Sequence, residues 1–227
     1  DRHNLLLFCH TFIGFLMMTT PTITPSTALL AVDVQNDFCP NGALAVAGGD
    51  EIIPIINQLM PKFTHVVITQ DYHPADHISF ASNQGLPEFS TITLPYGEQV
   101  LWPDHCIQGT FGAKLHAQLN TDFANLFIRK GTRAHIDSYS AFLEADGKTA
   151  TGLAGYLKEH GITQVFIAGL ATDFCVAWTA MDAAFFGFET WVIDDACRSI
   201  DVNGSLNDAW QQMIALGIKK TTSTILL

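Results

Sequence analysis

Short runs of apolar residues alternate along this chain with segments in which apolar residues recur at helical spacing. The first run, residues 28–34, is apolar throughout except for Asp33, which is typical of a strand buried on both faces. Further runs predict strands over residues 64–69, 125–129, 164–168, 189–193 and 224–227. Helices are expected over residues 51–60, 151–160 and 205–216, and from Cys175 to about Phe186.

This alternation of strands with helices predicts an α/β fold. We expect a single-domain, three-layer, doubly wound fold with a mostly parallel sheet and helices on both faces. A chain of 227 residues is long enough to bury one sizeable core, and neither a repeat nor a linker divides residues 18–227. The stretch 72–112 lacks clear periodicity, and loop regions of such length are usually functional.

Residues 1–17 have the apolar density of a signal-peptide core but lack its other features. They open with Asp1-Arg2-His3 rather than a basic cluster, and no small-residue cleavage site follows them. We expect residues 1–17 to be an extension outside the fold, of the kind that an upstream start codon would add before Met18. An export signal is the alternative.

Charge and cysteine usage narrow the classes of partner. The formal net charge is −11 and no cluster of Lys and Arg occurs, which argues against nucleic acid and anionic membranes as partners. The five cysteines are an odd number without a close CxxC pair, which fits free thiols in a reducing compartment, here the cytoplasm. A small-molecule substrate is the expected partner, and the sequence leaves a homo-oligomer open.

Cys175 follows a tight turn, residues 169–172, that joins an apolar run to the next predicted helix. A thiol at a helix N-terminus feels the positive end of the helix dipole, so we expect a lowered pKa and a favoured thiolate. The backbone N–H groups of the same turn would be free to bind an oxyanion. The alternative is that Cys175 is a small buried hydrophobic residue, which is the commoner fate of a lone cysteine.

Charged residues collect at the carboxyl ends of the predicted strands, where open α/β sheets bind ligands. Asp33 lies near the end of the first strand, Asp71 and Lys130 follow the second and third, and Cys175 follows the fourth. A carboxylate in so apolar a run is costly to bury unless it is paired, and Lys130 could be its partner. A structural ion pair is the alternative, but an acid, a lysine and a thiol together favour an activated nucleophile.

A second group of polar residues lies in the long region without periodicity. Asp71 and His73 would share one face of an extended segment, His77 follows four residues later, and His105 comes from the Trp102–Cys106 stretch. One carboxylate and two imidazoles suit iron(II), zinc or manganese and leave open positions. The spacing alone is a weak signal, and unconnected surface residues are the alternative.

Several segments, in this order along the chain, resemble the nicotinamidase (pyrazinamidase) family of isochorismatase-like cysteine hydrolases. They are AVDVQNDFCPNGALAV, TQDYHPADHISFAS, LWPDHC, a Lys-Gly pair followed by DSYSAF, and GLATDFCV, and they span about residues 28–196. Phe174 is a departure, because relatives have Tyr or His there. The resemblance implies hydrolysis of nicotinamide to nicotinate and ammonia in NAD salvage, and of pyrazinamide to pyrazinoate.

The resemblance further implies a catalytic triad of Asp33, Lys130 and Cys175. Asp33 would take the thiol proton, and Lys130 would hold the charges of the Asp–Cys pair. The backbone N–H groups of Ala171 and Cys175 would form the oxyanion hole, and a cis peptide is expected between Leu170 and Ala171.

The resemblance also implies a divalent metal ion, zinc or iron(II) before manganese, held by Asp71, His73 and His105. His77 is expected in the second shell or as a further ligand. In this family the metal binds the pyridine ring nitrogen and orients the substrate. Four residues would form the apolar walls around the ring: Phe38, Leu44, Trp102 and Tyr139.

Two rival functions are kept beside this one. The first is another amidohydrolase of the superfamily, acting on a carbamoyl or ureido compound. The DYH and WPDHC segments argue against it, because a metal that binds a ring nitrogen serves a heteroaromatic substrate. The second is a metal-binding or thiol-sensing protein without turnover, and the acid expected beside Cys175 argues against that function.

Overall fold

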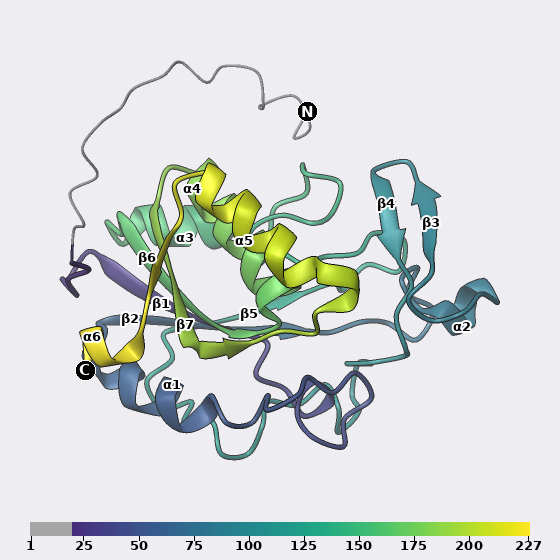
Figure 1. Ribbon diagram of the computed structural model, residues 1–227, viewed down its shortest axis with the longest axis horizontal. Coiled ribbons are helices and arrows are strands. Elements are labelled where there is room, and N and C mark those ends of the chain that lie inside the picture. Colours follow the sequence, from purple (N-terminus) through teal and green to yellow (C-terminus); the bar gives the residue numbers. More distant parts are fainter. Residues whose placement is uncertain (1–19) are drawn as a thin grey trace.

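A six-stranded sheet with the strand order β5-β2-β1-β6-β7-β8 forms the centre of the computed structural model, which describes residues 20–227 (Figure 1). Each pair of neighbouring strands in this sheet is parallel. The strands are β1 (Thr27–Val32), β2 (His65–Asp71), β5 (Leu126–Lys130), β6 (Gln164–Leu170), β7 (Glu189–Arg198) and β8 (Lys219–Thr221). The predicted α/β fold class is confirmed, while the expected extension over residues 1–17 lies outside the described residues.

The burial of strand β1 on both faces explains why apolar and polar residues do not alternate in its sequence. Leu29 and Ala31 belong to the hydrophobic cluster on one face of the sheet, whereas Ala28, Leu30 and Val32 belong to the cluster on the other face. All five are fully buried. Because side chains alternate between the two faces of a strand, a central strand that is covered on both sides must be apolar at every position.

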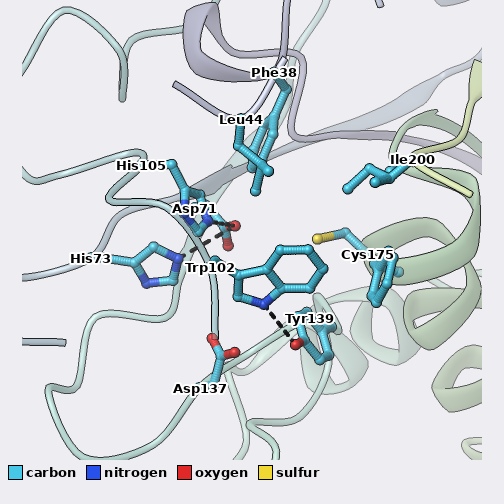
Figure 2. Close-up of a pocket in the computed structure, with 12 residues that line it drawn as sticks. Phe38, Leu44, Asp71, His73, Trp102, His105, Asp137, Tyr139, Cys175 and Ile200 are labelled. Carbon is cyan, nitrogen blue, oxygen red and sulfur yellow. Dashed lines mark hydrogen bonds and ion pairs between the residues drawn. The ribbon is translucent and has the colours of Figure 1, made fainter. Parts of the chain in front are cut away.

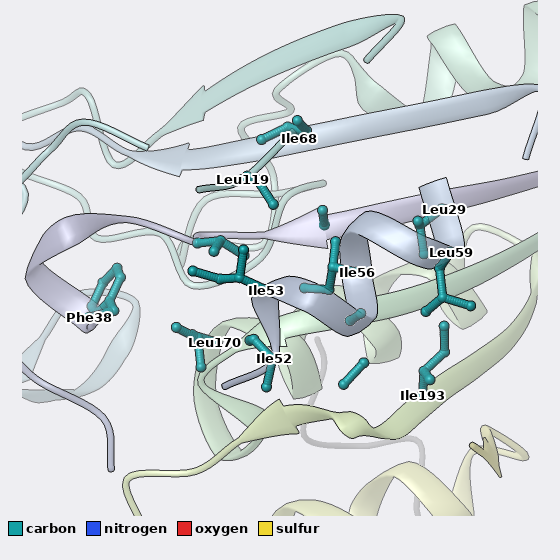
Figure 3. Packing of buried hydrophobic residues seen from close by; sticks show 14 of the residues in the cluster. Leu29, Phe38, Ile52, Ile53, Ile56, Leu59, Ile68, Leu119, Leu170 and Ile193 are labelled. Atoms are coloured by element: carbon teal, nitrogen blue, oxygen red, sulfur yellow. The ribbon is translucent and has the colours of Figure 1, made fainter. Parts of the chain in front are cut away.

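Helices cover both faces, as Figure 1 shows. One face carries α1 (Ile53–Leu59) and α6 (Ser223–Leu226), and the other carries α3 (Leu153–Glu159), α4 (Ala177–Phe185) and α5 (Ser205–Ala215). Helix α1 buries Ile53, Ile56 and Leu59, which recur at helical spacing on the side that faces the sheet (Figure 3). The hydrophobic cluster around α1 holds this helix against the strands whose carboxyl ends carry the candidate site.

The expected last strand, over residues 224–227, is wrong. The chain ends in helix α6, and the last strand is β8, which comes earlier. Helix α6 begins where Ser223 donates two hydrogen bonds to Asp195, from its backbone N–H (2.8 Å) and from its hydroxyl (2.5 Å). Leu226 then packs against the core, so its apolar side chain is buried by a helix rather than by a strand.

The long region without periodicity contains short elements of its own. These are helix α2 (Ala81–Gln84) and an antiparallel hairpin of β3 (Thr91–Leu94) and β4 (Gly97–Val100), which stands beside the main sheet in Figure 1. Short helical turns complete the described chain: η2 (Asn36–Phe38), η3 (Met60–Lys62), η4 (Thr172–Val176) and η5 (Val202–Gly204). Within residues 20–227, no helix has the length and apolar character needed to cross a membrane.

Candidate active site

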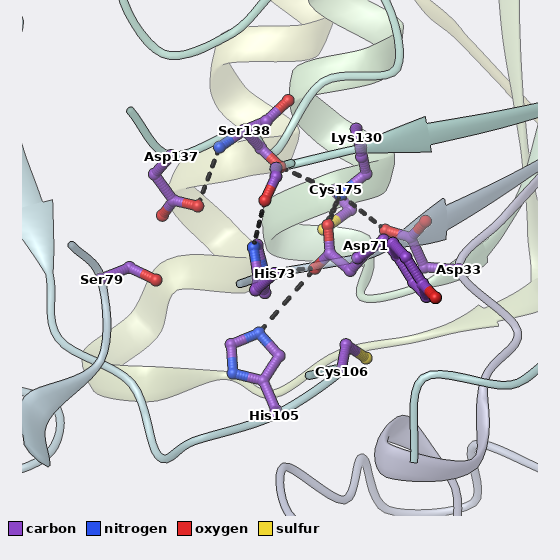
Figure 4. A network of polar contacts seen from close by, with 12 residues as sticks. Asp33, Asp71, His73, Ser79, His105, Cys106, Lys130, Asp137, Ser138 and Cys175 are labelled. Carbon is purple, nitrogen blue, oxygen red and sulfur yellow. Dashed lines mark hydrogen bonds and ion pairs between the residues drawn. The ribbon is translucent and has the colours of Figure 1, made fainter. Parts of the chain in front are cut away.

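A buried lysine joins two buried aspartates at the carboxyl edge of the sheet (Figure 4). Lys130 is the last residue of β5, Asp71 is the last residue of β2, and the two face each other in the strand register. Asp33 comes directly after β1, the next strand along. The Lys130 Nζ lies 2.8 Å from Asp33 Oδ2, forms an ion pair with Asp71, and donates a hydrogen bond to the Ser138 carbonyl (3.0 Å).

The charges in this group depend on one another. Burial alone would lower the pKa of Lys130, but Asp33 and Asp71 raise it well above its usual value, so the ammonium stays charged. Burial would raise the pKa of Asp71, but Lys130 and His73 hold it well below its usual range. The pKa of Asp33 is raised by burial, against the opposing effect of Lys130. The ionised form of Asp33 is therefore disfavoured by its surroundings, and a carboxylate in such a state is suited to accept a proton.

Asp33 is fixed by its neighbour on β2. Its backbone N–H donates to the Thr69 hydroxyl (3.1 Å), and that hydroxyl donates to Asp33 Oδ1 (2.5 Å). Asp33 has a left-handed backbone with φ of 50°, and the strand ends before it, at Val32, two residues earlier than expected. The other oxygen, Oδ2, is thus free of Thr69. It pairs with Lys130, and the carboxylate lies near the Cys175 sulfur.

Cys175 lies in the turn η4, directly after β6, and helix α4 begins only at Ala177. Its Sγ is 3.4 Å from Lys130 Nζ, and Sγ and one oxygen each of Asp33 and Asp71 lie within 4.8 Å of one another. The Leu170–Ala171 peptide before this turn is cis, as the resemblance implied.

The expected lowering of the Cys175 pKa is wrong. Burial raises the pKa of the thiol well above its usual value, the two carboxylates Asp33 and Asp71 raise it further, and Lys130 opposes them. The helix dipole argument fails because the thiol is buried beside two carboxylates. The resting group is a thiol, and a nucleophile is available only if a neighbour removes the proton.

Asp71, His73 and His105 turn one donor atom each toward a common point. The Nε2 atoms of His73 and His105 lie 3.5 and 3.8 Å from Asp71 Oδ2. The Nδ1 atoms are bound to backbone carbonyls, His73 to Gly131 (2.9 Å) and His105 to Pro103 (2.7 Å). A proton on each Nδ1 leaves the Nε2 lone pairs facing the carboxylate, which is the arrangement that orients imidazoles toward a metal. The three residues therefore fit a divalent ion.

Two residues that the sequence analysis did not select support this cluster. Gln35 is fully buried, and its side-chain amide forms two hydrogen bonds with the backbone of Asp71. It donates to the Asp71 carbonyl (2.8 Å) and accepts from the Asp71 N–H (2.8 Å). Gly131 has a positive φ of 62°, and a Cβ at this position would overlap the His73 imidazole. Both belong to the quoted segments, Gln35 in the first and Gly131 in the Lys-Gly pair, but a local pattern does not reveal their contacts.

His77 lies behind His73 rather than in the cluster. The two rings are tilted by 33° with centroids 4.1 Å apart, and burial lowers the pKa of His77 to about 4. Its Nδ1 is 2.7 Å from the Ser79 hydroxyl, and its Nε2 is 3.2 Å from the Ile136 carbonyl. A neutral ring with Nε2–H donated to the carbonyl accepts from Ser79 and keeps no lone pair for a metal.

A pocket opens between the thiol and the Asp–His cluster (Figure 2). The four expected wall residues Phe38, Leu44, Trp102 and Tyr139 all line it, and so does Ala171. The Trp102 indole donates to the Tyr139 hydroxyl (2.9 Å), which fixes two of these walls relative to each other.

Three further residues line the pocket without having been selected: Asp137, Phe174 and Ile200. Asp137 lies two positions before Tyr139 in the quoted DSYSAF segment, so alternation along an extended chain could have indicated it. Phe174 packs edge-on against Trp102, with centroids 4.8 Å apart. Ile200 carries no local signal, because it lies in a loop after β7.

Comparison with known proteins identifies the family of this chain. The family model of the isochorismatase domain matches residues 27–224. The nicotinamidase of Acinetobacter baylyi is 61% identical over 201 residues, which cover 88% of this chain and 94% of that protein.

Solved structures show the same likeness. The nicotinamidase and pyrazinamidase of Acinetobacter baumannii matches with a TM-score of 0.89 at 60% identity, over 90% of this chain and 99% of that chain. The pyrazinamidase of Pyrococcus horikoshii in complex with zinc matches with a TM-score of 0.72 at 37% identity, over 87% of this chain and 99% of that chain.

Proposed function

This chain belongs to the isochorismatase family, and we propose that it is a hydrolase that converts nicotinamide and water to nicotinate and ammonia. One observation carries the proposal: the buried Asp33 and Lys130 lie next to Cys175, and Cys175 lines a pocket whose opposite side presents a carboxylate and two imidazoles. Pyrazinamide, with the same ring shape and carboxamide, would give pyrazinoate. The reaction returns the pyridine ring to NAD salvage.

Asp33 acts first, as the base for the buried thiol. Its raised pKa makes the Asp33 carboxylate a stronger proton acceptor, and the proton moves from Sγ to the carboxylate as the sulfur attacks the carboxamide carbon. Lys130, 2.8 Å from Asp33 and 3.4 Å from the sulfur, stabilises negative charge on either partner. The backbone N–H groups of Ala171 and Cys175 are the proposed donors to the carbonyl oxygen while it is negative.

The same carboxyl group completes the turnover. The C–N bond breaks as protonated Asp33 gives its proton to nitrogen, and ammonia leaves a thioester on Cys175. Water then adds to the thioester and gives a proton back to Asp33. The C–S bond breaks, the acid product leaves, and the thiol takes up the proton that Asp33 holds. One base thus serves both halves of the reaction.

Asp71, His73 and His105 are the proposed ligands of a divalent metal ion, with zinc or iron(II) ahead of manganese because of the mixed N and O donors. Such an ion, when bound, would supply a Lewis acid for the ring nitrogen of the substrate. His77 holds the His73 ring from behind, as a second-shell residue. Phe38, Leu44, Trp102 and Tyr139 enclose the flat ring.

The thiols favour the cytoplasm as the compartment. Cys39, Cys106, Cys175 and Cys197 are each buried and free in the described part of the chain. A catalytic thiol needs a reducing environment, and the other buried thiols would gain nothing from an oxidising one.

Ammonia release from nicotinamide by the purified protein tests the proposal. We expect turnover by the wild type, loss to background in Cys175→Ala, and one equivalent of a first-row divalent metal by elemental analysis. Release of ammonia from N-carbamoyl compounds but not from nicotinamide would contradict the substrate assignment. Turnover of nicotinamide by Cys175→Ala would contradict the mechanism.

A further inference from the structure

Ile200 forms the wall of the pocket on the side of the thiol. It lines the pocket with Phe38, Leu44 and Cys175, and Figure 2 shows it beside Cys175, away from Asp71 and the imidazoles. A substrate whose ring nitrogen lies at the imidazole cluster must place its carboxamide near the sulfur. The Ile200 side chain therefore limits the space around the group that reacts.

Asp173 holds Ile200 in this place. It lies two residues before Cys175, in the same turn η4, and its side chain is almost fully buried. Its carboxylate accepts hydrogen bonds from the backbone N–H groups of Ile200 (3.1 Å) and Asp201 (2.8 Å) and from the Ser205 hydroxyl (2.5 Å). One carboxylate thus ties the turn of the nucleophile to the loop that supplies the pocket wall.

The loop of residues 199–204 needs such an anchor. It follows the end of β7, and Asp201 and Asn203 both adopt the left-handed backbone region, with φ of 54° and 53°. That region is uncommon for residues other than glycine, even for Asn and Asp, so the loop conformation is maintained by its contacts. Those contacts include the two hydrogen bonds that the backbone N–H groups of Ile200 and Asp201 donate to the Asp173 carboxylate.

We propose that Ile200 is a specificity-determining residue that restricts Cys175 to primary carboxamides, and that Asp173 is the positioning residue that holds Ile200 in the pocket. A primary carboxamide brings only hydrogen atoms on its nitrogen into the space beside Ile200. A secondary amide brings a methyl group or more and would collide with the Ile200 side chain. This inference rests on the proposed amidase function.

Two amides that differ by one methyl group test it: nicotinamide and its N-methyl amide. For each variant the ratio of kcat/KM for the secondary amide to that for the primary amide is measured, which does not depend on the fraction of folded enzyme. Ile200→Ala should raise this ratio by at least about 10-fold, the scale of one added methylene in an apolar pocket. Asp173→Asn, which replaces an acceptor by an NH2 group that faces N–H donors, should raise it in the same direction. The double variant should give no more than Ile200→Ala alone.

Asp195 supplies the matched control. It also accepts a backbone N–H and a serine hydroxyl, both from Ser223 at the start of α6, and it lines no part of the pocket. Asp195→Asn should lower thermal stability as Asp173→Asn does and leave the substrate ratio unchanged.

The results distinguish failure of the proposed amidase function from failure of the roles proposed for Ile200 and Asp173. A wild type that releases no ammonia from nicotinamide overturns the proposed function and this inference together. An active wild type whose ratio is unmoved by Ile200→Ala overturns only the specificity role. Equal changes of the ratio in Asp195→Asn and Asp173→Asn, or additive changes in the double variant, overturn the positioning role.

Discussion

Asp71 and Lys130 face each other as the last residues of two neighbouring parallel strands, β2 and β5, and their side chains form a buried ion pair. The pair is part of both halves of the site. Lys130 reaches on to Asp33 and the Cys175 sulfur, and Asp71 reaches on to the imidazoles of His73 and His105. A change at either residue therefore affects the thiol and the proposed metal ligands together.

Removal of the buried ammonium should damage stability as well as activity. Lys130→Met leaves the carboxylates of Asp33 and Asp71 without their cation, and a broken buried pair costs about 3–5 kcal/mol. Urea unfolding should show this loss at neutral pH, and a smaller loss as falling pH protonates the carboxylates. Lys219→Met is the control, because its pair with Glu189 is about half exposed on each side and is worth at most about 1 kcal/mol. Equal losses in the two variants would show that the Lys130 ammonium does not stabilise the buried carboxylates.

Asp33→Asn should separate activity from stability. Loss of the base should reduce kcat by at least about 10²–10⁴-fold. The folded pKa of Asp33 is raised above its unfolded value, so the ionised carboxylate costs stability above the folded pKa and no longer does so below the unfolded value. The variant should therefore be as stable as the wild type or more stable at neutral pH, with the difference shrinking in acid. Unfolding curves at several pH values measure this, and a variant that is less stable at neutral pH than in acid, relative to the wild type, would refute the sign.

Alkylation should depend on Asp33 as well. Iodoacetamide is a small primary amide, and it should modify Cys175 at neutral pH in the wild type because Asp33 removes the thiol proton. In Asp33→Asn this labelling should slow by more than about 10-fold, because no base takes the thiol proton and burial still raises the pKa of Cys175. Peptide mass spectrometry reads the site, with Cys39 as an internal reference whose pKa burial raises to about 11. Fast labelling of Cys175 in both proteins would show that the dipole activates the thiol after all.

Two glycines with the same backbone angle test the metal ligands without changing one. Gly131 and Gly85 both have φ of 62°, but a Cβ at Gly131 would overlap His73, whereas a Cβ at Gly85 would meet nothing within 4 Å. Each Ala variant should lose about 1–2 kcal/mol to the left-handed backbone. Only Gly131→Ala should also bind metal more weakly, by about 10–100-fold, as disturbed second-shell support does. Elemental analysis after dialysis checks this, and equal metal contents would argue against His73 as a ligand.

Benzamide should be a poor substrate. It has nearly the shape of nicotinamide but lacks the ring nitrogen, so the metal position stays with water and the ring is poorly oriented. The loss of such a polar contact can reduce kcat/KM by about 10⁴-fold. His105→Ala should remove most of the difference by lowering turnover of nicotinamide toward that of benzamide. Comparable rates for both amides in the metal-loaded wild type would show that the metal is structural.

The sequence was most informative where a polar residue interrupts or ends an apolar run. Asp33, Asp71, Lys130 and Cys175 could be placed at one edge because each lies at or just after the end of a strand, and parallel strands end on the same side. The end of the chain was misassigned because four apolar and polar residues fit a strand or a helix equally well. The Asp195 hydrogen bonds that select the helix come from β7.

The pKa of Cys175 could not be judged from local sequence either. A position near a helix start is visible in the sequence, but burial beside two carboxylates is a result of tertiary packing. Ile200 was missed for a related reason, since its place in the pocket depends on hydrogen bonds to Asp173, which is far away along the chain.

The polar row at the sheet edge follows the strand order, Lys130 on β5, Asp71 on β2, Asp33 after β1 and Cys175 after β6. Neighbouring strands in a sheet lie about 4.8 Å apart, so the hydrogen bonds between strands determine the distances between these groups. A slip of β2 by one residue would present Gln70 or Tyr72 where Asp71 belongs and would turn the carboxylate to the far face. A sheet with shifted register would thus lose the arrangement of catalytic groups even if it stayed folded. The strand pairing that determines the fold therefore also determines the chemistry of the site.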